Sequence, residues 1–438
     1  MHCLTVCIFT NPLASNILHT LLSSDLNEKF HGAGTGGGST PVSFRWILLA
    51  PDQAEWSQLA EAVHSYPSKG ACCVGGQGTM ETARTAQQVQ LPKTYRRLVA
   101  HRTGHSFRDV AVLEEAQLQA PGPGQVVIKV TYAGINGGCE TFRARGEFAF
   151  AGNKSVDSFL LGAEGAGIIA AVGPDVDNLK VGQHVTFVGG AFGEYVTAKA
   201  ATCWPVQQAL PEAVALTISG VTAAAALEVT SPVQAGEIVM VTAAAGGTGH
   251  FGVQLAKLAG AHVVATCGGP HKAEVLRDLG ADRVIDYKSE DVADVLEQEY
   301  PQCIDLAYEG VGGQLRQTVL DNLTPQGRML CVGYISEYPH TDAAAGAAST
   351  SGNLPPAEEL FWQQRTVQRG EQTIFGNVWP KDRAAMLQAK QRLFDRYYGG
   401  EIKALIDKSQ QFKGIDSVVD AIEYMLSGVT IGKVVVEM

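Results

Sequence analysis

Residues Ile238 to Gly252 read IVMVTAAAGGTGHFG, and this stretch decides the fold. Its first four residues form a short apolar run of β-favouring types, which predicts a buried strand. From Phe251 to Ala259 apolar residues recur at helical spacing, which predicts a helix. The bend between them contains Gly247-Thr248-Gly249-His250-Phe251-Gly252, a G-x-G-x-x-G pattern. The stretch therefore predicts a strand, a glycine bend and a helix in succession.

Each glycine of this pattern has a physical role in holding a dinucleotide. Gly247 allows the tight turn, Gly249 lets the backbone approach a pyrophosphate, and Gly252 lets the helix pack closely on the strand. Gly246 and Thr248 complete the predicted loop. Amides at the start of the helix would then face the phosphates. An ordinary glycine-rich turn is the alternative, but the strand and helix on either side favour dinucleotide binding.

Length and composition limit the classes of protein to consider. A chain of 438 residues is long enough for two or three domains. The net charge of −11 argues against a nucleic-acid partner, which would require a basic face. No apolar run approaches the roughly 18 residues of a membrane span. Scattered cysteines without a C-x-x-C pair indicate reduced thiols in an intracellular protein.

The first 92 residues differ in composition from the rest and are expected to be a poorly ordered extension. Residues 32–40 are rich in glycine and indicate a flexible linker, and a helix is expected near residues 52–63. Asp25 and Glu28 precede any arginine, which is atypical of an organelle transit peptide. We therefore expect a cytoplasmic protein, with a chloroplast, mitochondrion or peroxisome as the alternative.

The residue pattern of the rest of the chain changes twice. Between residues 93 and 205 short β-rich runs are separated by glycine and proline turns, which predicts a small β-rich domain. Strand and helix patterns alternate over residues 206–376, which predicts a doubly wound parallel sheet and an α/β fold. This alternation includes a helix expected at 357–368, after a long loop at 339–356 with the features of a lid. Residues 377–438 are assigned to the β-rich domain.

The residues after the second strand of the sheet indicate which nicotinamide cofactor binds. An NAD-preferring fold usually places an acid near Cys267-Gly268-Gly269, where it bonds the ribose 2′-hydroxyl, but no acid follows until Glu274. Cationic or phenolic side chains occur nearby instead: Lys272, Arg283, Tyr287 and Lys288. Cations suit the additional 2′-phosphate of NADPH, so NADPH is the predicted cofactor. The alternative is that Lys272 is only a solvated lysine at a helix start.

Four motifs resemble those of a known family. AAAGGTGHFGVQLAK (243–257), LGADRVIDYK (279–288), YEGVGG (308–313) and GRMLCVGYIS (327–336) resemble the medium-chain dehydrogenase/reductase superfamily, most closely its zinc-independent quinone oxidoreductase and prostaglandin reductase branch. The resemblance covers about Lys93 to the C-terminus. It implies a Rossmann domain for NADPH, a GroES-like substrate domain and a homodimer.

Zinc-binding alcohol dehydrogenases of this superfamily carry a cysteine in G-V-C and a histidine in G-H-E. This chain has Gly134-Ile135-Asn136 and Gly162-Ala163-Glu164 at the matching positions, and the four-cysteine run of the structural zinc is missing. We therefore predict no metal. Hydride addition to a conjugated C=C bond requires donor alignment and a hydrogen-bond donor for the developing enolate.

The resemblance also implies roles for individual residues. Those expected to contact the cofactor, besides the glycine bend, are Thr222 in S-G-x-T-A, Lys272 and Tyr287 at the 2′-phosphate, and Gly333 and Tyr334 along the nicotinamide. Asn136 is expected near the nicotinamide and Tyr338 near the enone oxygen or the ribose. A turn asparagine and an exposed loop tyrosine are the respective alternatives. The family motif N-x-x-D is broken here, because Cys139 replaces the aspartate.

These observations predict an NADPH-dependent reductase acting on the C=C bond of α,β-unsaturated ketones or aldehydes. A quinone oxidoreductase on the same scaffold is the alternative. A non-catalytic NADPH-binding protein is a third hypothesis, because function is set by sites and not by folds.

Overall fold

The structure is a computed structural model that describes residues 5–9, 45–49, 91–104, 106–144, 158–337 and 366–438. The chain separates into two compact units, Met1–Arg84 and Thr85–Met438. In the first unit, β1 (Thr5–Phe9) and β2 (Arg45–Leu49) pair in parallel. The linker and the helix predicted for this region lie outside the described residues, so they stay predictions.

A seven-stranded sheet forms one half of the second unit, here called the α/β half, in the order β13-β12-β11-β14-β15-β17-β16. Its strands are β11 (Ile238–Val241), β12 (His262–Cys267), β13 (Arg283–Asp286), β14 (Ile304–Glu309), β15 (Leu323–Cys331), β16 (Thr366–Arg369) and β17 (Gln372–Phe375). All neighbours pair in parallel except β16 and β17, which form an antiparallel hairpin. The strand order reverses at β11, where ligands bind in open α/β sheets. The predicted doubly wound sheet is confirmed.

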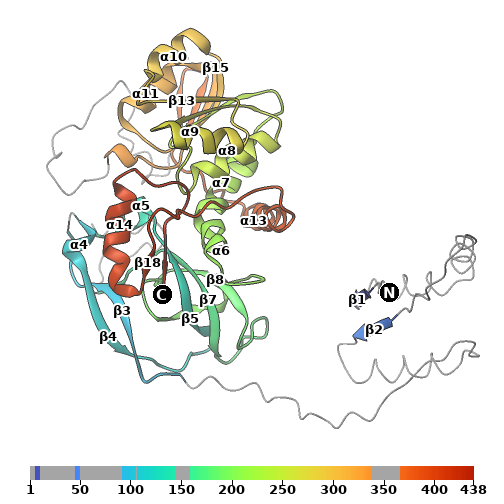
Figure 1. Cartoon of the computed structure of the whole chain (residues 1–438), viewed down its shortest axis with the longest axis vertical. Coiled ribbons are helices and arrows are strands. Elements are labelled where there is room, and N and C mark those ends of the chain that lie inside the picture. Colours follow the sequence, from blue (N-terminus) through green and yellow to red (C-terminus); the bar gives the residue numbers. More distant parts are fainter. Residues whose placement is uncertain (1–4, 10–44, 50–90, 105, 145–157, 338–365) are drawn as a thin grey trace, which may run out of the picture. The chain divides into compact units, whose positions relative to one another are not determined.

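Helices alternate with these strands: α8 (Gly249–Leu258), α9 (Pro270–Asp278), α10 (Val292–Glu299) and α11 (Gly313–Asp321) (Figure 1). Successive residues of β11 face opposite sides of the sheet. Val239 and Val241 belong to the core cluster that includes residues of α8 and α9. Met240 belongs to the cluster that includes residues of α10 and α11. The apolar run is thus buried on both faces, which is why it lacks polar alternation.

One predicted helix was partly wrong. The pattern at 357–368 was read as helical, yet Thr366–Arg369 is the strand β16 and pairs with β17. Residues 357–365 lie outside the described part of the chain. Pairing with a neighbouring strand outweighed the local helical spacing, as tertiary context often does.

The other half of the second unit is β-rich. One sheet has the order β10-β8-β7-β5-β19-β18 with β9 on β5, and a second has the order β4-β3-β6. Their strands are β3 (Thr94–Ala100), β4 (Ala111–Gln117), β5 (Gln125–Gly134), β6 (Phe159–Leu160), β7 (Glu164–Val172), β8 (His184–Val188), β9 (Tyr195–Lys199), β10 (Trp204–Pro205), β18 (Phe412–Lys413) and β19 (Val435–Glu437). The helices α4 (Phe107–Val110), α5 (Gly137–Ala144) and α14 (Val418–Leu426) accompany them.

The end of the chain returns to this β-rich half. β19 pairs antiparallel with β5, with Val435 opposite Gly134. The long helix α13 (Arg383–Tyr398) instead packs on the α/β half, where Leu393 and Phe394 join the core. The boundaries predicted at 205/206 and 376/377 stay predictions.

A helical path of 20 residues, Pro211–Thr230, joins the two halves. It consists of α6 (Pro211–Ala215), the π-helical turn η2 (Leu216–Gly220), α7 (Val221–Ala225) and a second π-helical turn, η3 (Ala226–Thr230). With a mean hydropathy of 1.6 it is long and apolar enough to cross a membrane, which the sequence analysis missed. Because 72% of its apolar window is buried, we assign it to the core.

Candidate functional site

The glycine bend lies between β11 and α8, as predicted. An ideal Cβ on Gly249 would lie 2.4 Å from the carbonyl oxygen of Ala243, so no side chain fits there. Thr248 occupies the N-cap position of α8, but its hydroxyl donates to the carbonyl of Ser219 (2.9 Å) and accepts no hydrogen bond from the helix amides. Within the described part of the chain, the amide of Thr248 donates no hydrogen bond, and the amide of Gly247 faces only the Gly432 carbonyl of an isolated bridge. The start of α8 is therefore available to an anion.

Tyr308 on β14 supports this bend from below. Its hydroxyl lies 2.7 Å from Oγ1 of Thr248, and it donates because the threonine hydrogen is engaged with Ser219. A Cβ on Gly252 would lie 3.2 Å from the Tyr308 ring, so the third glycine permits the close packing that the pattern predicts. Burial raises the pKa of Tyr308 above its ordinary value, and the phenol remains a neutral donor.

The 2′-phosphate site predicted from the sequence is a cationic corner beyond β12. The hydroxyl of Tyr287 lies so close to Gly268 that a Cβ there would be 2.6 Å away. The ammonium of Lys272 donates to the carbonyl of Gly428 (2.6 Å). Burial, with a smaller contribution from Lys288, lowers the pKa of Lys272. Lys272, Tyr287 and Lys288 thus lie around one position, where an additional phosphate would be favourable.

Arg283 was counted among the cations near the predicted 2′-phosphate site, but its guanidinium is already paired with carboxylates. It lies at the start of β13, and its guanidinium bonds Glu290 and Glu299 at 2.6 and 2.8 Å. Both carboxylates neutralise the guanidinium, so Arg283 does not contribute to the predicted cationic site. An acid also approaches the turn from β13: Asp286 accepts hydrogen bonds from the amides of Gly269 (2.7 Å) and Lys288 (3.1 Å). These bonds lower its pKa.

Asn136 belongs to a buried network that the sequence reading missed. The ammonium of Lys433 donates to Glu164 Oε1 (2.5 Å), Asn136 Oδ1 (2.7 Å) and Ser219 Oγ (3.3 Å). Nδ2 of Asn136 donates to the same Glu164 oxygen (2.8 Å), and the other carboxylate oxygen accepts from the Ile218 amide (2.6 Å). The side chains of Glu164 and Lys433 are 0% and 2% exposed. A lysine opening an apolar strand, Lys433-Val434-Val435-Val436, was the available signal.

This network adjoins the glycine bend. A Cβ on Gly247 would lie 3.5 Å from Cδ of Lys433. Gly246 and Gly432 form an isolated parallel bridge, and the Gly432 amide donates to Ala245. Through Lys433 the fold thus connects Asn136, which was predicted near the nicotinamide, to the predicted pyrophosphate loop.

The remaining predicted residues are placed less closely. Thr222 lies half-buried on α7, directly after η2. Gly333 and Tyr334 follow β15, and Tyr334 is buried (1% exposed). The amide of Ile335 donates to the carbonyl of Gly310, which joins this segment to the turn after β14. Tyr338 lies outside the described residues. The roles assigned to these residues stay predictions.

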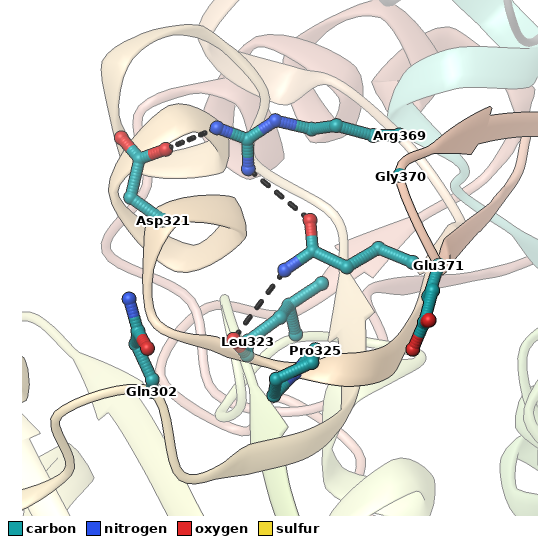
Figure 2. A pocket seen from close by; sticks show the side chains of 8 residues that line it. Gln302, Asp321, Leu323, Pro325, Arg369, Gly370 and Glu371 are labelled. Carbon is teal, nitrogen blue, oxygen red and sulfur yellow. Dashed lines mark hydrogen bonds and ion pairs between the residues drawn. The ribbon is translucent and has the colours of Figure 1, made fainter.

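The described residues offer no metal site, and a pocket that they line lies away from the glycine bend. No group of three or more His, Cys, Asp or Glu among the described residues is arranged to hold a metal ion. A pocket of about 570 Å³ lies at the amino ends of β14, β15 and β17, whereas the glycine bend follows the carboxyl end of β11. Figure 2 shows Arg369 of this pocket bonded to Asp321. Arg369 also bonds Gln372, and the pocket lies at the edge of the sheet opposite the glycine bend, so we do not assign it to the reaction.

Comparisons with known proteins agree with this geometry. Residues 122–208 match the family described as "Alcohol dehydrogenase GroES-like domain", and residues 247–389 match "Zinc-binding dehydrogenase". The sequence is 33% identical over 357 residues to "Prostaglandin reductase-3" of Mus musculus, covering 80% of this chain and 90% of that protein. It is 34% identical over 360 residues to a "Probable quinone oxidoreductase" of Leishmania amazonensis, covering 79% and 99%.

A solved structure agrees as well. The "Crystal Structure of 2-Haloacrylate Reductase" superposes with a TM-score of 0.57 at 27% identity, covering 78% of this chain and 99% of that one. The motifs of the glycine bend and of residues 308–313 are most like prostaglandin reductase 3, and the relatives of that name support this interpretation.

Proposed function

The chain belongs to the medium-chain dehydrogenase/reductase superfamily, in its quinone oxidoreductase and prostaglandin reductase branch, and from this membership we propose that it reduces the C=C bond of α,β-unsaturated ketones and aldehydes with NADPH. NADPH, when bound, supplies the hydride for the β-carbon. Prostaglandin reductases and 2-haloacrylate reductase, similar to this chain, carry names of unsaturated substrates.

The observation that carries the proposal is the pairing of an uncapped helix start with a cationic corner beyond the next strand. The amides of Gly247 and Thr248 would hold the diphosphate, since Thr248 donates to no acceptor in the described residues and Gly247 faces only the isolated bridge to Gly432. Lys272 and Tyr287, with Lys288 beside them, would hold the 2′-phosphate. The residues present fit a phosphorylated dinucleotide at both ends of the adenosine half.

The substrate side requires a hydrogen-bond donor where the carbonyl oxygen becomes an enolate. Asn136 supplies a side-chain amide beside the glycine bend, and Tyr334 and Tyr338 are further candidates. Asn136 and Ala163 occupy the positions at which zinc-dependent relatives carry cysteine and histidine, so in this proposal neutral donors stabilise the developing charge. Proton addition to the α-carbon, from solvent or a side chain, completes the reduction.

A turnover assay with two cofactors and four acceptors tests the proposal. Purified full-length protein is supplied with NADPH or NADH and with a 2-alkenal, an enone, a quinone, or the saturated ketone as a control. We expect NADPH oxidation and the saturated carbonyl product with the enone or alkenal, and no reaction with the saturated ketone. Turnover of the quinone alone would favour the quinone oxidoreductase. Tight NADPH binding without turnover of any substrate would favour a non-catalytic protein.

We further propose a homodimer in the cytoplasm. β16 is the outermost strand of the parallel sheet, and Thr366 and Gln368 on it are exposed. An exposed edge offers unpaired backbone groups to a second copy. Light scattering of the purified protein at several concentrations tests the dimer, and imaging of a tagged full-length chain tests the compartment against an organelle.

A further inference from the structure

The buried lysine beside the glycine bend carries an inference about how Asn136 is oriented. An ammonium group has three donors and no acceptor. All three donors of Lys433 are matched by oxygen atoms, those of Glu164, Asn136 and Ser219. No donor is left for a phosphate, so a direct cofactor contact by Lys433 would require one of these bonds to break.

We propose that Lys433 and Glu164 together are positioning residues, which fix the amide of Asn136 so that one N–H is held ready for the cofactor or the substrate. The oxygen of the amide must face Lys433, because an ammonium only donates. Its nitrogen must face Glu164, because a carboxylate only accepts. A flipped amide would place like partners against each other on both sides. This inference rests on the proposed function for the identity of the ligand.

The side-chain amide of Asn136 has one hydrogen left to donate to a ligand. The Nδ2 group has two hydrogens, and one of them is used by Glu164 Oε1 at 2.8 Å. The second has no acceptor among the described residues. Asn136 is half-buried, so a ligand beside the glycine bend can reach it. The two charges therefore commit Asn136 to the role of donor, which is what a developing enolate requires.

The test removes both charges at once, because a single change would leave its partner buried and unpaired. The variants are Glu164→Gln/Lys433→Met, Asn136→Ala and the triple variant. A matched control, Lys413→Met/Glu437→Gln, removes an exposed ion pair from the neighbouring strands β18 and β19. Single-turnover hydride transfer and NADPH affinity are measured for each.

We expect the charge-free pair to slow hydride transfer by about ten- to a hundredfold while NADPH affinity changes little. In the Asn136→Ala background the same double change should cost less than about twofold, because its effect passes through Asn136. If the double change slowed hydride transfer by the same factor in the Asn136→Ala background as in the wild type, the proposal would be overturned. A loss confined to NADPH affinity would also overturn it, since Lys433 would then be a phosphate ligand. The control pair should match the wild type.

A spectroscopic measurement separates this inference from the proposed function. With selective ¹⁵N-asparagine labelling, the side-chain signals of Asn136 are identified by their loss in Asn136→Ala. We expect slowly exchanging protons, one shifted by its bond to a carboxylate, which revert to the values of exposed asparagines in the charge-free variant. Unchanged signals would refute the positioning role. An inactive wild type with the expected signals would refute only the proposed function.

Discussion

The Nε2 atom of His250 accepts a hydrogen bond at 3.0 Å from the backbone amide of Leu405, 155 residues further along the chain. Its Nδ1 lies 2.9 Å from the carbonyl of Gly246 and must carry the proton. The imidazole, inside the G-x-G-x-x-G pattern, therefore joins the glycine bend to the C-terminal segment. A second proton on the ring would place an N–H against the Leu405 amide.

Acid should weaken the fold through this histidine. Burial lowers the pKa of His250 to about 4. The unfolded histidine takes up a proton below about pH 6.5. Between these values only the unfolded state binds the proton, so stability is fully present above pH 6.5 and falls as the pH approaches 4. The expected contribution to the free energy of unfolding is about 3 kcal/mol. Urea unfolding across this range measures it, and His250→Gln should show a shallower dependence. Equal slopes would contradict the argument.

Lys272→Ala should change cofactor preference. A charge-assisted hydrogen bond contributes about 1.5–3 kcal/mol, so the Kd for NADPH should rise roughly ten- to a hundredfold while that for NADH stays the same. The matched control is Lys257→Ala on α8, whose ammonium pairs with Asp282 at 2.7 Å on the surface. It should leave both affinities unaltered. Equal weakening of the two cofactors by Lys272→Ala would remove the phosphate assignment.

The two glycines of the bend should respond differently to alanine. Gly249→Ala places a methyl group 2.4 Å from a backbone oxygen and should destabilise the fold by roughly 1–3 kcal/mol. Gly247→Ala makes only ordinary contacts, 3.5 Å from Lys433 Cδ, so Tm should stay close to that of the wild type. Its methyl group would lie at the amides proposed for the diphosphate, so NADPH should bind more weakly. Calorimetry with and without NADPH distinguishes the variants, and NADPH affinity unaffected by Gly247→Ala would argue against this loop.

Lys390 should titrate near neutrality. Its ammonium lies 4.4 Å from the centre of the Trp204 ring, and burial lowers its pKa to about 8. Loss of the proton removes the cation–π contact, so the fluorescence of Trp204 should change with a midpoint near pH 8. Since the unfolded lysine keeps its proton to a higher pH, stability should rise as the pH passes 8. Lys390→Met should abolish the fluorescence change, and its persistence would exclude Lys390 as the cause.

Structural features that depend on residues close together in the chain were predicted correctly from the sequence. The bend at Gly247–Gly252 was identifiable because its strand, turn and helix are adjacent in the chain, and each glycine meets a nearby backbone or ring. The engagement of Arg283 was not predictable from spacing, because its partners Glu290 and Glu299 reach its guanidinium only in the folded chain. The strand β16 was missed because its backbone pairs with β17, and this pairing outweighs the helical spacing of its apolar residues.

By itself the sequence determined the parallel sheet and the glycine bend, since these depend on neighbouring residues and on strand order, and it predicted the cationic corner at Lys272 and Tyr287. Only the tertiary structure decided the hydrogen-bond partners of Asn136 and the orientation of its side-chain amide. β19 pairs antiparallel with β5, Val435 opposite Gly134, and this register carries Lys433 to Asn136 and Glu164. No spacing along the chain encodes that meeting, because it depends on the pairing of two strands that lie far apart in the sequence.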